Sequence, residues 1–107
     1  MSKKNLTTFG ETIRRLREEQ KLPQRKVAAV LDIDTSLLAK YERNVRQPSI
    51  ELIEKIAKLF NVDSQTLIFE AVTDKIANQF IEEDIDSKIL RVAENKAEYL
   101  KSKKKAS

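Results

Sequence analysis

The stretch LPQRKVAAVLDIDTSLLAKYERNVRQPS, residues 22–49, contains two short runs in which apolar residues recur at three- and four-residue spacing. That spacing is typical of amphipathic helices, and it predicts helices over about 23–31 and 35–43. Pro23 suits the first turn of the earlier helix, where its missing N–H would have no partner in any case. The letters DID between the two runs predict a tight turn.

Polar residues beside the two runs favour helix ends at these places. Asp34 is a good N-cap for the second helix, and Asn44 can adopt the left-handed conformation that ends it. Two short helices joined by such a turn match a helix-turn-helix, although any small helical bundle contains pairs of this kind. The spacing alone therefore does not decide what the second helix contacts.

Helical periodicity continues on both sides of this stretch. The letters TFGE, residues 8–11, form a capping box that starts a helix extending to about Gln20. Ser49 and Asp63 are placed to cap two further helices. The expected fold class is all-α, with a five-helix domain over residues 8–68 and a C-terminal helical extension. The apolar residues expected in the core of the domain are Phe9, Ile13, Leu16, Val27, Ala28, Leu31, Leu38, Tyr41, Leu52, Ile53, Ile56, Ala57, Phe60 and Leu67.

The extension, residues 69–101, carries more apolar residues at helical spacing on both sides of the polar break EEDIDS. It is expected to form either a helical hairpin or one bent helix. Its aromatic residues Phe69 and Phe80 are expected in a core rather than as platforms for stacked bases. The last residues, 102–107, are expected to form a disordered basic tail. The apolar stripe of the extension comprises Phe69, Val72, Ile76, Phe80, Ile89, Val92 and Leu100.

This stripe needs burial, and two solutions are open. Isologous pairing with the same surface of a second copy would make 69–101 a dimerisation extension. Docking of the last helix onto the five-helix domain of the same chain is the alternative. We expect the homodimer, because isologous pairing with the same surface of a second copy is the economical way to bury the stripe.

The composition excludes several kinds of chemistry. The chain has no cysteine and no histidine, which removes disulfides, thiol catalysis, the usual zinc sites and imidazole acid–base catalysis. No cofactor and no metal are expected. No apolar run approaches the roughly 18 residues of a membrane span, and the first ten residues lack the apolar core of a signal peptide. The expected location is the cytoplasm, in association with the nucleoid.

Charge is distributed unevenly along the chain. Residues 1–48 have a net charge of +5, residues 49–100 have −5, and residues 101–107 add four lysines. A basic face attracts a polyanion, and nucleic acid is the commonest one. Two solvated helical faces without a partner are the alternative.

The polar face of the second helix favours DNA. If Leu38 and Tyr41 point inward, small and basic side chains are left on the outer face. In a helix-turn-helix, the N-terminal part of this helix meets base edges in the major groove. Hydroxyls can donate or accept there, and lysine can donate to guanine. The outward residues are Thr35, Ser36, Ala39, Lys40 and Arg43.

From about Phe9 to Leu67 the chain resembles the lambda-repressor-like Xre/Cro family of helix-turn-helix domains. The letters that carry the resemblance are FGETIRRLREE, LPQRKVAAVLDID, SLLAKYER and RQPSIELIEKIAKLFNV. The resemblance implies a five-helix DNA-binding fold. The chain departs from the family pattern at Asp32 and Asn44, where glycine is usual. Both residue types tolerate positive φ better than other non-glycine residues.

The resemblance also implies roles for single residues. Gln24 would hold a phosphate or a base edge, and Arg25 at the edge of the motif is expected on the DNA backbone. Glu42 would pair with Arg17 and orient the recognition helix, either as a buried ion pair or as an exposed pair of little consequence. The implied base-reading residues are Thr35, Ser36 and Lys40. The implied DNA-backbone residues are Arg43, Asn44 and Arg46.

These expectations favour a sequence-specific transcriptional regulator that binds double-stranded DNA as a homodimer on a two-fold symmetric operator. The sequence around TDKIA and VAENKAEYL resembles that of small regulators found beside bacterial DNA methyltransferase genes. This likeness suggests control of a restriction–modification or methylation locus. An antitoxin-type protein-interaction module that regulates its own operon is the alternative. An enzyme is not expected, since histidine, cysteine and a glycine-rich phosphate loop are all missing.

Overall fold

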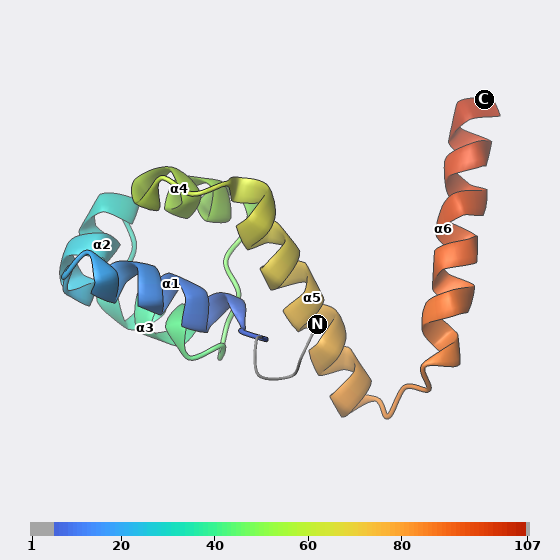
Figure 1. Ribbon diagram of the computed structural model, residues 1–107, viewed down its shortest axis with the longest axis horizontal. Coiled ribbons are helices and arrows are strands. Elements are labelled where there is room, and N and C mark those ends of the chain that lie inside the picture. Colours follow the sequence, from blue (N-terminus) through green and yellow to red (C-terminus); the bar gives the residue numbers. More distant parts are fainter. Residues whose placement is uncertain (1–5, 107) are drawn as a thin grey trace. The chain divides into compact units, whose positions relative to one another are not determined.

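The computed structural model describes residues 6–106 of the chain. In this part it contains six α-helices and no β-strand, which confirms the expected all-α class (Figure 1). The chain divides into two compact units, one ending at Asp74 and the other starting at Lys75. The structure defines each unit by itself.

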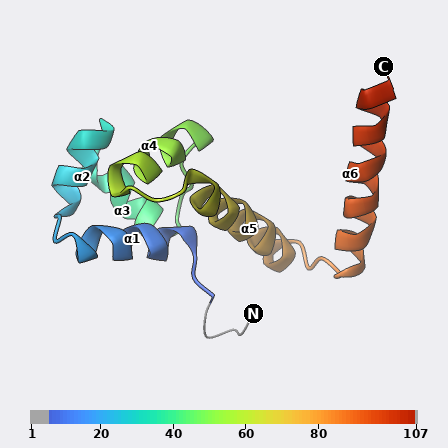
Figure 2. The same cartoon turned by 45° about the horizontal axis from the view of Figure 1, so that its top comes forward.

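Four helices and the beginning of a fifth build the first unit. Helix α1 packs against α3 and α4, and α2 also packs against α3 and α4. Figures 1 and 2 show these four helices gathered together, with α5 starting directly after α4. The five-helix arrangement predicted from the sequence is therefore confirmed. The bounds are α1 Phe9–Glu19, α2 Gln24–Leu31, α3 Thr35–Glu42, α4 Ile50–Phe60 and α5 Ser64–Glu82.

The core of this unit draws apolar side chains from all five helices. Leu16, Leu37 and Leu52 are partly buried and pack against it. The buried members are Phe9, Ile13, Val27, Ala28, Leu31, Leu38, Tyr41, Ile53, Ile56, Ala57, Phe60, Leu67 and Ala71.

Phe69, expected in a core and on the stripe of the extension, does not belong to the core of the first unit. Leu67 and Ala71 are buried on α5, and Phe69 follows the first and precedes the second by two positions. Two positions correspond to a rotation of about 200° on a helix, so Phe69 points to the opposite side. Its side chain is 65% exposed.

Local sequence sets most helix ends as expected. Thr8 Oγ1 accepts from the Glu11 N–H at 3.2 Å and the Thr8 N–H donates to Glu11 Oε1 at 3.0 Å, which completes the capping box. Ser49 Oγ caps α4 by accepting from Leu52 N–H at 3.2 Å. Asp34 occupies the N-cap of α3, but its side chain makes no capping bond. Asp32 and Asn44 have φ angles of 57° and 60°, in the left-handed region predicted for them.

The first unit extends further than the boundary expected after residue 68. Helix α5 continues without a break, and its next residues remain attached to the other helices. Glu70 Oε2 accepts from Thr12 Oγ1 at 2.8 Å, and the Ala71 carbonyl accepts from Gln47 Nε2 at 2.8 Å. These long-range bonds, together with burial of Ala71, explain why the unit ends at Asp74.

The second unit comprises the rest of α5 and helix α6, Lys88–Ala106, with the break at the expected polar segment. The prediction of a disordered tail over 102–107 is wrong for residues 102–106, which continue α6; residue 107 lies outside the described residues. Lysines favour helix and suit the negative end of its dipole. Ser102 Oγ also donates to the Tyr99 carbonyl at 2.7 Å, and Lys103 Nζ lies 5.3 Å from the Tyr99 ring centre.

No residue over 75–105 is buried by the helices of the second unit itself. None of the helices in residues 6–106 is long and apolar enough to cross a membrane.

Candidate nucleic-acid interface

The turn between α2 and α3 is built as a helix-turn-helix requires. Asp32 ends α2 in the left-handed conformation, and the Ile33 N–H donates back to the Ala28 carbonyl at 3.0 Å. Leu38 and Tyr41 then bury the inner face of α3 in the core. This fixes the rotation of α3 and turns its other face away from the unit.

The outward face of α3 is polar and accessible. Thr35, Ser36 and Lys40 are exposed, as the sequence predicts, while Ala39 is half-buried. Within the described part of the chain, the side chains of these three exposed residues take part in no hydrogen bond or ion pair. Their donors and acceptors therefore remain available to an external ligand.

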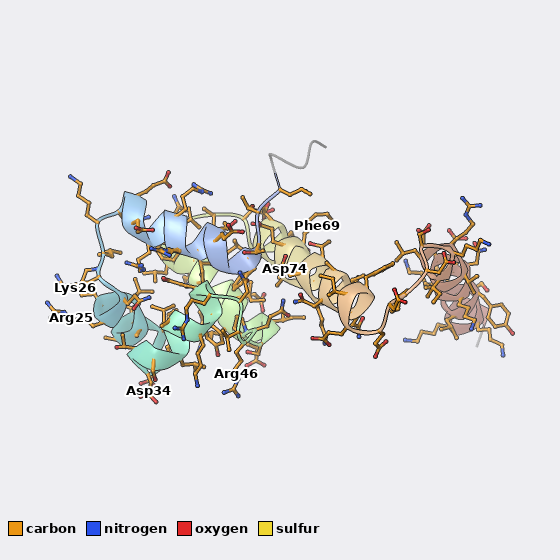
Figure 3. All side chains as sticks on the ribbon, turned by 90° about the horizontal axis from the view of Figure 1, so that it is seen from below. Arg25, Lys26, Asp34, Arg46, Phe69 and Asp74 are labelled. Atoms are coloured by element: carbon orange, nitrogen blue, oxygen red, sulfur yellow. The ribbon has the colours of Figure 1, made fainter. Side chains whose placement is uncertain are left out.

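Arginines lie at both ends of the motif. Arg25 stands at the start of α2, Arg43 follows α3, and Arg46 lies in the loop to α4; all three are exposed. Figure 3 shows Arg25, Asp34 and Arg46 along one edge of the first unit. A polyanion placed against α3 would therefore meet cations from more than one element.

The structure brings Arg17 and Glu42 together in a bidentate ion pair. Arg17 Nε lies 2.7 Å from Glu42 Oε2, and Arg17 Nη2 lies 3.0 Å from Glu42 Oε1. Their side chains are 12% and 3% exposed, so this is the buried alternative. The hydrogen bond to Glu42 raises the pKa of Arg17, against the lowering effect of burial. Arg17 Nη1 also donates to the Leu22 carbonyl at 2.8 Å, which links three segments.

Gln24 joins this ion pair, a contact that sequence reasoning missed. Gln24 Nε2 donates to Glu42 Oε1 at 3.0 Å. The bond fixes the orientation of the half-buried Gln24 side chain at the start of α2. Glu42 therefore accepts three hydrogen bonds, and its charge is neutralised inside the unit rather than presented beside α3.

Asn44 lies at the end of α3, but its side chain is used within the chain. Asn44 Oδ1 accepts from the Gly10 N–H at 3.0 Å, and Asn44 Nδ2 donates to Thr8 Oγ1 at 2.6 Å. The Asn44 side chain is therefore bonded to the start of α1, and its role on the DNA backbone stays a prediction. Sequence reasoning missed Gly10 here; the signal was that the only glycine of the chain occupies the first turn of a helix.

Most of the apolar residues expected to pair in a dimer are exposed. Phe69, Val72 and Ile76 are accessible on α5, and Ile89, Val92 and Leu100 on α6. Phe80 is half-buried. Neither unit by itself therefore buries this stripe.

Comparison with known proteins identifies the family. The family model described as Helix-turn-helix matches residues 13–67, about half of the chain. The chain therefore belongs to the helix-turn-helix family, and its resemblance to the lambda-repressor-like Xre/Cro members is confirmed.

Two relatives support this membership. The chain is 36% identical over 81 residues to the cryptic phage CTXphi transcriptional repressor RstR of Vibrio cholerae, covering 76% of this chain and 68% of RstR. It is 32% identical over 92 residues to the antitoxin PezA of Streptococcus pneumoniae, covering 86% of this chain and 56% of PezA. The chain thus spans little more than half of PezA.

Two solved structures are similar in fold. The restriction-modification controller protein C.AhdI from Aeromonas hydrophila gives a TM-score of 0.52 at 30% identity, over 55% of this chain and 89% of C.AhdI. The biofilm regulator SinR, solved in complex with DNA, gives 0.53 at 29% identity, over 57% of this chain and 98% of that chain. The chain is a DNA-binding helix-turn-helix regulator of transcription by these relationships.

Proposed function

We propose that the chain binds a specific duplex sequence by inserting α3 into the major groove. Thr35, Ser36 and Lys40 meet base edges, because they form the free outward face of a helix whose other face is fixed in the core. This combination of a buried inner face and an unengaged polar outer face is the observation that carries the proposal.

We also propose that contacts to the DNA backbone surround this face of α3. Arg25 and Gln24 at the start of α2 and Arg43 and Arg46 after α3 hold phosphates on either side of the groove. The exposed arginines bring unpaired positive charge to the edge of the motif. Such contacts fix the register of the protein on the duplex and make its affinity depend on salt.

We also propose that the protein acts as a homodimer on a two-fold symmetric operator. The exposed stripe from Phe69 to Leu100 supports this proposal, since neither unit by itself buries these apolar side chains. A second copy offers the same surface, and isologous pairing would cover both. The two copies of α3 would then reach half-sites about 34–36 Å apart.

We further propose which kind of locus the protein regulates. The resemblance to regulators beside DNA methyltransferase genes, together with the similarity to C.AhdI, favours a restriction–modification or methylation locus. The similarity to the antitoxin PezA favours a second candidate, an antitoxin-type module that holds a protein partner and regulates its own operon. Both would act at the nucleoid in the cytoplasm.

Selection of bound sites from a pool of random duplexes tests the proposal. We expect an inverted repeat whose half-sites are separated by about one helical turn. A protein–DNA complex containing two chains per duplex should accompany it. Enrichment of no sequence would refute base reading, and an asymmetric site bound by one chain would refute the dimer.

A further inference from the structure

The first turn of α1 is held by side chains from three separate segments of the first unit. The first N–H groups of a helix have no partner within the helix. Here the Phe9 N–H donates to Asp74 Oδ2 at 2.7 Å, the Gly10 N–H to Asn44 Oδ1 at 3.0 Å, and the Glu11 N–H to Thr8 Oγ1 at 3.2 Å. We call this set of bonds the α1 junction.

The α1 junction reaches the end of the recognition helix through direct backbone contact. A Cβ atom at Gly10 would lie 2.6 Å from the Glu42 carbonyl oxygen and closer still to that of Tyr41. Only glycine therefore allows α1 to approach the last turn of α3 this closely. Asn44 fastens the contact, because its side chain bonds both Gly10 and Thr8.

The same turn of α1 is attached to α5. Asp74 accepts from Phe9, and Glu70 Oε2 accepts from Thr12 Oγ1 at 2.8 Å and from Thr7 Oγ1 at 2.9 Å. These bonds hold α1 from the side of α5, while Asn44 holds it from the end of α3. The loop after α3 is thus anchored to α5 through one helical turn.

We propose that Asn44 and Asp74 are positioning residues for the phosphate contacts of Arg43 and Arg46. The inference rests on the proposed function, which assigns these arginines to the DNA backbone. Arg43 and Arg46 lie on either side of Asn44 and are themselves exposed. A fixed Asn44 limits where their backbone can move, so less conformational entropy is lost when they bind phosphate.

Asn44→Gly removes both side-chain bonds of Asn44, to Gly10 and to Thr8, without requiring a new backbone conformation, since glycine adopts positive φ readily. Asn61→Gly is the matched control. Asn61 has a φ of 55°, ends α4 in the left-handed conformation, and is exposed. The two variants therefore change the same residue type in the same conformation, at one site inside the junction and one outside it.

The assay is the affinity of the full chain for a duplex of random sequence at several salt concentrations. Asn44→Gly should weaken binding about three- to tenfold, as expected for one or two side chains that must be ordered anew. It should also reduce the slope of log affinity against log salt by about one phosphate contact. Asn61→Gly should change neither quantity, and thermal unfolding should show both variants folded at the assay temperature.

Substitutions of Asp74 test the positioning role independently. Asp74→Ala removes the acceptor of the Phe9 N–H, whereas Asp74→Asn keeps an acceptor oxygen; both remove the same negative charge. Loss of an acidic charge by itself should tighten binding to DNA. The proposal predicts that Asp74→Ala nevertheless binds more weakly than Asp74→Asn, with a shallower salt slope.

Arg43→Ala and Arg46→Ala in the same assay separate the two possible failures. If either arginine variant weakens binding but Asn44→Gly matches Asn61→Gly, or Asp74→Ala matches Asp74→Asn, the positioning role is wrong and the phosphate contacts stand. If neither arginine variant changes binding, the phosphate contacts are wrong and the positioning role falls with them.

Discussion

The two units of the chain differ in what they bury. The first unit buries an apolar core that ends with Ala71, whereas no residue over 75–105 is buried by the helices of the second unit itself. Both units are helical, and α6 with 19 residues is longer than any of α1 to α4, so helix formation alone does not distinguish the units. The first unit has a core that can stabilise it, and the second has apolar side chains that still need a cover.

This difference between the two units indicates which surface serves which function. In the first unit, burial fixes the rotation of α3 and leaves a polar face free. In the second unit, polar and apolar side chains alike are exposed, and the exposed apolar ones include Ile89 and Val92. Exposed apolar stripes on helices are typical of surfaces that bind another protein. This contrast supports the proposal that the first unit reads DNA and that the exposed apolar stripe from Phe69 to Leu100 pairs with a second copy.

The largest effect is expected from breaking the buried Arg17–Glu42 ion pair of the first unit. Glu42→Ala leaves the Arg17 guanidinium largely buried without its partner, which should cost about 3–5 kcal/mol of the free energy of unfolding. Glu18→Ala breaks the exposed Arg14–Glu18 pair on α1, with side chains 61% and 56% exposed, and should cost under about 1 kcal/mol. Urea unfolding measures both. Equal losses would show that the buried pair has no special role.

Matched truncations in the two units sharpen the comparison further. Leu38→Ala creates a cavity in the core of the first unit and should cost about 2–5 kcal/mol. Leu100→Ala in α6 should change the free energy of unfolding by under about 0.5 kcal/mol at a protein concentration where the chain is monomeric. A comparable loss for Leu100→Ala would mean that α6 has a core within one chain.

Variants on the DNA-binding surface separate base reading from phosphate contact. Lys40→Ala should cost about 1–3 kcal/mol on the selected site and much less on random duplex. Arg43→Ala should weaken binding to both duplexes alike and make the salt dependence shallower by about one phosphate contact. Binding isotherms on the two duplexes distinguish the cases. An equal loss for Lys40→Ala on both would remove this residue from base reading.

The smallest expected effect concerns pH. Burial raises the pKa of Asp74, opposed by the hydrogen bond from Phe9 and assisted by the charges of Glu70 and Glu11. A raised pKa in the folded state contributes stability that is present below the ordinary carboxyl pKa and lost as pH rises through the folded-state value. Relative to wild type, Asp74→Asn should therefore become more stable as pH rises across this range. A difference that does not change with pH would contradict this assignment.

Local patterns were sufficient to predict most of the fold. Periodicity gave the core residues of α2, α3 and α4, and cap chemistry gave the Thr8 box, the Ser49 cap and the positive φ of Asp32. Each of these features depends on residues a few positions apart, so a single sequence contains the information. The exposed face of α3 followed once its buried face was known.

Contacts between distant residues were not predictable in the same way. The bonds of Asp74 with Phe9 and of Glu70 with Thr12 join residues 65 and 58 positions apart. No periodicity encodes such pairs, and only packing of α5 against α1 brings them together. The helical course of residues 102–106 was missed because a lysine-rich end lacks the apolar spacing that identifies a helix.

The division of roles between the two units is tested most directly by sedimentation equilibrium of the full chain and of the double variant Ile76→Glu/Val92→Glu. Both substitutions place a charge on the exposed apolar stripe and leave the core of the first unit intact. We expect the full chain to have the mass of a dimer and the variant that of a monomer with an unchanged thermal transition. A monomeric full chain, or a variant that remains dimeric, would contradict the assignment of pairing to the second unit.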